Sequence, residues 1–314
     1  MKRTVSLLLV LCMLLSTLPI TAIAEKIPGE SITRQISTDT SVLLSDAGEA
    51  NISAPKDTIV PLISDAYSDT LSWSYDASTY TLTISGIGAM PDDGISAMPW
   101  AKYQPIMKHL IVENGITAIG KNAFYNCSCL TTVTLPMTLS SISERGFYGC
   151  INLSSITFPD ALESIGSYAF HNCSSLSTVM LPASLSSLGV HSFSNCKRLT
   201  SADLSATQID ALPAYVFNGC TLITDVKLPD TIISIGNQAF YSCKSLTSLS
   251  FPVTLETISA SAFQYCDALT SVYFYGNTPP SLQTPFQALH LVLSFTTSKV
   301  KQAGQVLPGT ISTP

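Results

Sequence analysis

Residues 150–173 read CINLSSITFPDALESIGSYAFHNC, and this pattern recurs along more than half of the chain. Seven times a phenylalanine is followed by a cysteine at the third position after it, and the pairs recur with a period of about 23 residues. Self-similarity at a fixed period of this length indicates stacked supersecondary units. The seven pairs are Phe124/Cys127, Phe147/Cys150, Phe170/Cys173, Phe193/Cys196, Phe217/Cys220, Phe240/Cys243 and Phe263/Cys266.

Each unit has the pattern of a leucine-rich repeat. Residues 153–158 carry apolar side chains in the spacing L-x-x-L-x-L, which predicts a strand, and Pro159 ends it because proline lacks the N–H that a ladder needs. Leu162 and Ile165 follow at a spacing of three, which suits a short helical or 3₁₀ return leg. We therefore predict a β-rich leucine-rich repeat solenoid over residues 107–290, with a parallel β-sheet and short helical or 3₁₀ return legs.

The phenylalanines and cysteines are predicted to form the structural ladder of this solenoid. Each ring would insert between neighbouring coils, and each thiol would lie in the bend that follows. Successive thiols would be about 4.8 Å apart, the strand spacing, so disulfides along the ladder are compatible with distance. Free thiols are favoured because buried cysteine behaves as a small hydrophobic residue. Cys129 is out of phase, and the repeat gives it no position.

Residues 1–24 have the features of an export signal. Lys2 and Arg3 precede an apolar run, and Ala22-Ile23-Ala24 forms a cleavage site, so the mature chain is expected to begin at Glu25. A retained membrane anchor is the alternative, and the short apolar run argues against it. No later stretch is long and apolar enough to span a bilayer. These features predict a secreted protein that is extracellular or associated with the cell surface.

The segments that flank the solenoid are expected to differ from it. Residues 25–66 are rich in Ser, Thr, Asp and Pro and are predicted to be a flexible leader. Residues 67–106 contain two alternating segments that predict a β-hairpin, which would cap the open end of the solenoid with Trp73 and Trp100 as covers. Residues 291–314 are expected to form a C-terminal cap and tail.

Composition argues against several classes of function. The net charge is −6 and no Lys/Arg cluster is present, which disfavours nucleic-acid binding. The four histidines, His109, His171, His191 and His290, lack metal-ligand spacing, and His171 and His191 are expected to face solvent. No G-x-S-x-G motif or other nucleophile–base set is present. We predict no enzyme activity, no catalytic residue, no cofactor and no metal.

The strand positions that point away from the core are the candidate partner surface. Most of them are small hydroxyl residues, which bind weakly, whereas hot spots favour large side chains. Met180, Tyr273 and the group Asp203, Asp225 and Lys227 depart from this pattern, so we predict a weak or multivalent partner contact there. A merely solvated Ser/Thr surface is the alternative. The outward pairs are His109/Ile111, Thr132/Thr134, Ser155/Thr157, Thr178/Met180, Ser201/Asp203, Asp225/Lys227, Ser248/Ser250 and Ser271/Tyr273.

One unit is longer than the others by a single position. The extra residue lies near positions 205–208, between Cys196 and Cys220, and Ser205 replaces the proline found in other units. It is interpreted either as a tolerated insertion on the return side or as a contact loop.

The repeat resembles the BspA-like leucine-rich repeat, also called the Treponema pallidum type. Its best copies run from Leu228-Pro229 to Cys243 and from Phe158-Pro159 to Cys173. The block at residues 82–91, followed by Pro99-Trp100, is similar to a lead-in on exported bacterial members. The resemblance implies a secreted or surface-attached bacterial protein that binds other proteins, in some members host matrix or neighbouring cells, with no catalytic site and no cofactor.

Two functions are compatible with these features. The first is a secreted or cell-surface protein that mediates adhesion-type protein–protein interaction through the solenoid surface, with a host matrix protein, a bacterial surface protein or a glycan as partner. The second is a structural or assembly protein that self-associates through the solenoid edges or through thiols.

Overall fold

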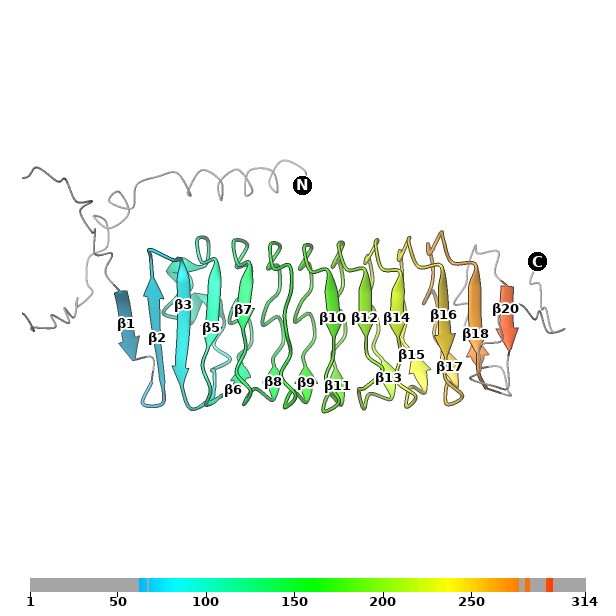
Figure 1. The fold of residues 1–314 in the computed structure, drawn as a ribbon, viewed down its shortest axis with the longest axis horizontal. Helices are drawn as coiled ribbons and strands as arrows, with labels where there is room; N and C mark the ends of the chain where they lie inside the picture. The colour runs from blue at the N-terminus through cyan, green and yellow to red at the C-terminus, as the bar shows by residue number, and fades with distance from the viewer. Residues whose placement is uncertain (1–61, 67, 277–279, 283–291, 296–314) are drawn as a thin grey trace, which may run out of the picture.

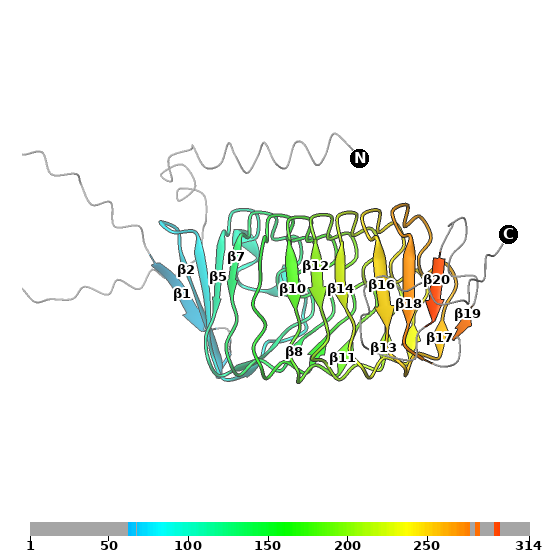
Figure 2. The same cartoon turned by 45° about the vertical axis from the view of Figure 1, so that its right-hand side comes forward.

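The protein is an elongated parallel β-solenoid, which confirms the predicted fold class (Figures 1 and 2). The computed structural model describes residues 62–66, 68–276, 280–282 and 292–295. The predicted signal at residues 1–24 therefore lies outside the described residues, as does most of the predicted leader and tail. Each coil typically contributes one strand to each of two parallel rows, and a third side carries the phenylalanine.

The first row of strands is called the strand face here. Its strands pair in parallel with partners one coil further along the chain, for example Thr178 with Ser201 and Ser201 with Asp225. The strand predicted at residues 153–158 is not formed, and the row is also interrupted after β14. The strands are β3 (Thr81–Gly86), β5 (His109–Val112), β7 (Thr132–Thr134), β10 (Thr178–Met180), β12 (Ser201–Asp203), β14 (Asp225–Lys227), β16 (Ser248–Phe251), β18 (Ser271–Phe274) and β20 (Val292–Phe295).

The return legs differ from the short helical or 3₁₀ form that was predicted. They carry a second row of short strands, and the 3₁₀ helices of the described chain, η3 (Ile95–Ala97) and η4 (Ala101–Tyr103), precede the first coil. The row is interrupted between β11 and β13, where the extra residue lies. Its strands are β4 (Gly88–Ala89), β6 (Ile116–Ile119), β8 (Ser141–Ile142), β9 (Ser164–Ile165), β11 (Ser187–Leu188), β13 (Ala211–Leu212), β15 (Ser234–Ile235), β17 (Thr257–Ile258) and β19 (Ser281–Leu282).

The turn around each phenylalanine explains why no helix continues there. Positive φ occurs two positions before and two positions after the ring, as at Tyr168 (59°) and Asn172 (61°), and a left-handed residue ends any right-handed helix. The N–H groups of Tyr168, Phe170 and Asn172 donate to carbonyls one coil further on, at 2.8–2.9 Å. The turn therefore forms a third hydrogen-bonded ladder between coils.

The seven phenylalanines stack along the axis of the solenoid. Each is fully buried, and neighbouring ring centroids are 5.2–6.0 Å apart with interplanar angles of 3–22°. The rings therefore insert between neighbouring coils, as the repeat predicted.

The cysteines that follow the rings form a row of their own. All seven are free and buried, so the disulfides that distance alone would allow are not formed. The prediction placed each thiol in the bend that follows the ring, and the structure adds a contact with the neighbouring coil. From Cys150 to Cys266, each thiol reaches back and donates to the phenylalanine carbonyl of the preceding coil, at 3.0–3.3 Å. Cys266, at the end of the row, makes this bond to Phe240 at 3.0 Å.

Burial keeps the thiols of Cys173, Cys220 and Cys243 protonated. It raises the pKa of Cys173 and of Cys220 to about 12. Burial, followed by a hydrogen bond with Cys266, raises the pKa of Cys243. Cys129, which the repeat left without a position, is buried as well.

An antiparallel hairpin covers the first coil. β2 (Leu71–Asp76) pairs with β3, which pairs in parallel with β5, and β1 (Leu62–Ala66) adds an outer antiparallel strand. This strand falls within the segment predicted to be a flexible leader. Trp100 extends the phenylalanine stack, with its ring 6.2 Å from that of Phe124. Trp73 is also buried, 5.9 Å from the ring of Tyr103.

Two columns of rings lie on the phenylalanine side of the solenoid, and together we call them the ring array. In one column Tyr125, Tyr148 and His171 stack at 4.8–4.9 Å, and in the other Tyr168, His191 and Tyr215 stack at 4.3–4.5 Å. His171 and His191 are 6.2 Å apart. Both are half-buried, with Nδ1 atoms that are buried and have no hydrogen-bond partner in the described structure, which corrects the expectation that they face solvent.

The phenylalanine stack predicts a large loss of stability when one ring is removed. Phe193 lies between Phe170 and Phe217, so we expect Phe193→Ala to lower the free energy of unfolding by about 3–5 kcal/mol, the usual cost of such a cavity. Urea unfolding followed by far-ultraviolet circular dichroism measures this change. Met180→Ala, at an exposed position, should change it by less than about 0.5 kcal/mol. Equal effects of the two variants would contradict the stacking role.

The ring array predicts an acid-sensitive stability. Burial, followed by the charge of His191, lowers the pKa of His171 to about 4, and burial lowers that of His191. The unfolded chain therefore binds these protons first, so stability should be complete above about pH 6.5 and should fall as the pH decreases toward 4. His171→Tyr/His191→Tyr inserts the residue found at each position in the neighbouring coil. Thermal unfolding across this range should show a smaller decrease for the variant, and parallel curves for both proteins would refute the assignment.

Candidate interaction surface on the strand face

The register of the strands arranges the outward side chains in two rows across the coils. One row contains His109, Thr132, Thr178, Ser201, Asp225, Ser248 and Ser271, and the other contains Ile111, Thr134, Met180, Asp203, Lys227, Ser250 and Tyr273. Ser155 and Thr157 belong to the coil in which no strand forms.

The structure brings four of the five predicted partner-binding residues together. Met180 pairs with Asp203 and Asp203 pairs with Lys227 on three successive strands, while Asp225 lies on the same strand as Lys227. Met180 is 74% exposed. Tyr273 is on β18, next to Ser250, so one strand separates it from Lys227.

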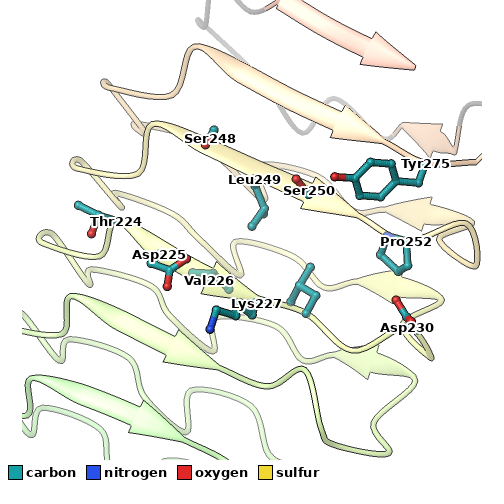
Figure 3. A pocket seen from close by; sticks show the side chains of 11 residues that line it. Thr224, Asp225, Val226, Lys227, Asp230, Ser248, Leu249, Ser250, Pro252 and Tyr275 are labelled. Carbon is teal, nitrogen blue, oxygen red and sulfur yellow. The ribbon is translucent and has the colours of Figure 1, made fainter. Parts of the chain in front are cut away.

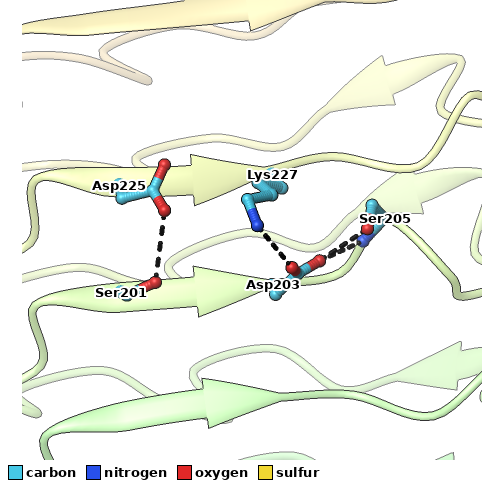
Figure 4. A network of polar contacts seen from close by, with 5 residues as sticks. All are labelled: Ser201, Asp203, Ser205, Asp225 and Lys227. Carbon is cyan, nitrogen blue, oxygen red and sulfur yellow. Dashed lines mark hydrogen bonds and ion pairs between the residues drawn. The ribbon is translucent and has the colours of Figure 1, made fainter.

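A polar network fixes the charged members of this group (Figure 4). Lys227 Nζ donates to Asp203 Oδ2 at 2.9 Å, and the backbone N–H and hydroxyl of Ser205 donate to Asp203 Oδ1 at 3.0 and 2.6 Å. Burial would raise the pKa of Asp203, but the hydrogen bonds from Ser205 and Lys227 outweigh it and lower the pKa. The same contact raises the pKa of Lys227. The pair is therefore ionised at neutral pH.

The long unit also shapes the turn that contains this network. The turn after β12 is closed by the N–H and the hydroxyl of Thr207, both of which donate to the carbonyl of Leu204 at 3.0 and 2.8 Å. Asp203 accepts from Ser205 within the same turn, which is the local bond that an aspartate commonly makes two residues ahead. The insertion thus lies beside the predicted contact residues, and Ser205, which replaces the proline of other units, orients the Asp203 carboxylate with an N–H that proline would lack.

A hollow of about 460 Å³ lies between β14 and β16, and we call it the slot (Figure 3). No hydrogen bond joins the two strands in the described structure, so their facing backbone edges are open. The slot is bordered by charged and hydroxyl side chains and by a ring, namely Asp225, Lys227, Asp230, Thr224, Ser248, Ser250 and Tyr275.

A step in side-chain size accounts for the slot. The last inward position of the strand is a leucine in four coils, including Leu204 and Leu228, and becomes a phenylalanine at Phe251. The ring of Phe251 meets Phe263 edge-on at 6.1 Å, and Leu228 on the smaller side of the step is left half-buried, whereas Leu204 is fully buried. We attribute the separation of β14 from β16 to this mismatch.

The same step occurs once more and has the same consequence. Leu135 precedes Phe158, Leu135 is half-buried, and the strand at residues 153–158 is not formed. A ladder of Ser and Thr hydroxyls, each bonded to the carbonyl one coil earlier, runs through Thr131, Ser177, Thr200, Thr224 and Thr270 at 3.0–3.3 Å. Ser154 and Thr247 hold the equivalent position at the two Leu-to-Phe steps, and their hydroxyls make no such hydrogen bond in the described structure.

A second hollow, of about 490 Å³, lies on the first two coils and is more apolar. Ile111, Leu135 and Met137 line it, and Met137 is 77% exposed. Sequence reasoning missed this hollow because Met137 follows the strand and is not an outward strand position. It also missed the ring array, which a comparison of equivalent repeat positions would have revealed.

The described residues hold no metal-binding group of three or more His, Cys, Asp or Glu side chains. The same part of the chain contains no helix with the length and hydrophobicity of a membrane span.

Comparison with known proteins agrees with the repeat. The family described as "BspA type Leucine rich repeat region" matches residues 102–222 and 210–285 in 6 copies, which is more than half of the chain. A search of curated proteins gave no match.

Solved structures of bacterial leucine-rich repeat proteins also match. The T. pallidum leucine-rich repeat protein is 23% identical over 63% of this chain and 86% of its own, with a TM-score of 0.43. A leucine-rich repeat protein from Eubacterium ventriosum is 21% identical over 75% of this chain and 84% of its own (TM-score 0.42). A leucine-rich cell surface protein from Faecalibacterium prausnitzii is 18% identical over 75% and 96% (TM-score 0.28). On the strength of the repeats that it shares with the family over residues 102–285, the chain belongs to the BspA-type leucine-rich repeat family.

Proposed function

We propose that this protein is exported and binds other proteins through its strand face, at the patch formed by Met180, Asp203, Asp225, Lys227 and Tyr273. One observation carries the proposal: Met180, Asp203, Asp225 and Lys227 lie on the neighbouring strands β10, β12 and β14, and Asp225 and Lys227 also line the slot. Solenoids characteristically bind through extended surfaces of this kind.

The chemistry of the patch suits a protein partner. Met180 offers a flexible apolar side chain that adapts to irregular surfaces, and Tyr273, which is 38% exposed, offers a ring of the type enriched at hot spots. The Asp203–Lys227 pair lies between them with fixed charges, which favour partners of matching polarity. Neighbouring Ser and Thr side chains add little area, so the affinity of a single site is expected to be modest.

An extracellular location is part of the same proposal. It is supported by the export signal at residues 1–24, with Lys2 and Arg3 before an apolar run and Ala22-Ile23-Ala24 as cleavage site. The partner would then be a host matrix protein or a bacterial surface protein, with a glycan as a further candidate, and the protein itself could remain associated with the cell surface. No enzyme activity is proposed.

Self-association is the second candidate function, and the outer strand favours it. Among the described residues β1 pairs with β2 alone, and residues 64–66 are exposed, which would offer an edge to a second copy. The thiol route has no such support, because the seven ladder thiols are buried. Light scattering of the mature chain with and without reductant tests this candidate, and a monomer under both conditions would eliminate it.

We expect Met180→Ser/Tyr273→Ser to weaken partner binding at least ten-fold, because it removes the two large side chains of the patch. Binding of the mature chain to an array of purified matrix and bacterial surface proteins measures the effect. The matched control is Ile87→Ser/Tyr265→Ser, which removes an exposed pair of similar size that lies outside the patch and lines neither hollow, 74% and 48% exposed. If the control loses binding and the patch variant keeps it, the strand-face patch is not the binding surface.

A further inference from the structure

The slot between β14 and β16 differs from the paired parts of the strand face because the backbone groups that face each other across it form no ladder. An unpaired strand edge presents N–H and C=O groups that can bind a ligand. The hydroxyls of Ser248 and Ser250 border the slot, and Asp225 and Tyr275 lie at its margins (Figure 3). Its volume of about 460 Å³ is within the range of small-ligand sites.

The charges around the slot favour a cation. Its only basic residue, Lys227, already pairs with Asp203 at 2.9 Å, so it is not available to an anion. The carboxylate of Asp225 contacts the hydroxyl of Ser201 at 3.4 Å. The pKa of Lys227 is raised mainly by its hydrogen bond to Asp203 and further by the charge of Asp225, but the close ion pair of Lys227 is with Asp203. Asp230 adds a second carboxylate to the lining. An incoming anion would therefore meet the Asp225 carboxylate and an ammonium group that is already paired with Asp203.

We propose that the slot receives the guanidinium group of an arginine in a basic segment of a protein partner, with Asp225 as its counter-ion. This proposal rests on the proposed function, since it names the chemistry of the partner at the same surface. Arginine fits better than lysine because its planar group presents five N–H donors, pairs with a carboxylate through two of them and stacks on aromatic rings. The Tyr275 ring lines the slot, and the exposed Tyr273 ring stands on the next strand. The net charge of −6 supports attraction of a basic partner.

Nuclear magnetic resonance titration of the full mature chain tests the proposal. The probe is a short Gly/Ser peptide with two arginines, and the matched probe carries citrulline, the neutral isostere of arginine. We expect the arginine peptide to shift the backbone amides of Val226, Leu249 and Ser250, with a Kd at least five-fold lower than that of the citrulline peptide. Asp225→Asn should raise the Kd for the arginine peptide at least five-fold. Asp160→Asn, the same change at another exposed aspartate three coils away, should leave it unchanged.

Three results would overturn the proposal. The first is an equal Kd for the arginine and citrulline peptides. The second is an equal effect of Asp225→Asn and Asp160→Asn on the Kd of the arginine peptide. The third is a larger chemical-shift change of the slot amides with a neutral oligosaccharide than with the arginine peptide, which would assign the slot to a glycan. If the arginine peptide does not shift the slot amides while Met180→Ser/Tyr273→Ser still abolishes binding of a protein partner, the inference fails and the proposed function stands. If neither variant affects any partner, both fail.

Discussion

The stacking of one phenylalanine on the next is the interaction on which the rest of the structure depends. The rings stay stacked even across the longer unit, where Phe193 and Phe217 are 6.0 Å apart, so the extra residue is accommodated elsewhere in the coil and the register of the stack is kept. Positive φ values on both sides of each ring turn three N–H groups toward the following coil. Stability is thus built from nearest-neighbour contacts, as expected of a solenoid, and each coil contributes a similar share.

Much of this arrangement could be predicted from the sequence because the spacing between repeats is nearly constant. Once Phe147 and Phe170 are aligned, the strand positions and their outward residues follow, and Met180, Asp203 and Lys227 fall on adjacent strands. The return legs were harder to predict. Apolar residues three positions apart occur both in a 3₁₀ turn and in a short strand that leads into a turn. The residues with positive φ decide between the two, and they include tyrosine and histidine, whose presence in a sequence does not indicate positive φ.

The slot could not be predicted from any single unit because it arises from a difference between two neighbours. A leucine and a phenylalanine are each acceptable at the last inward strand position, and the mismatch exists only where Leu228 meets Phe251. The half-burial of His171 and His191 has the same origin, since each ring is covered by the tyrosines of adjacent coils. A repeat is best interpreted by comparing equivalent positions across its copies.

Departures from the repeat therefore mark the places where the exposed side chains and backbone groups differ from those of the regular coils. In the longer unit, Ser205 stands in place of the repeat proline and donates to Asp203, and Asp203 in turn forms the close ion pair with Lys227. The carboxylate of Asp225 on the same strand contacts the hydroxyl of Ser201. The step at Phe251 opens the backbone on the other side of the same strand. Two unrelated irregularities, one of length and one of side-chain size, thus converge on β14. This convergence distinguishes the patch from the uniform Ser/Thr surface around it.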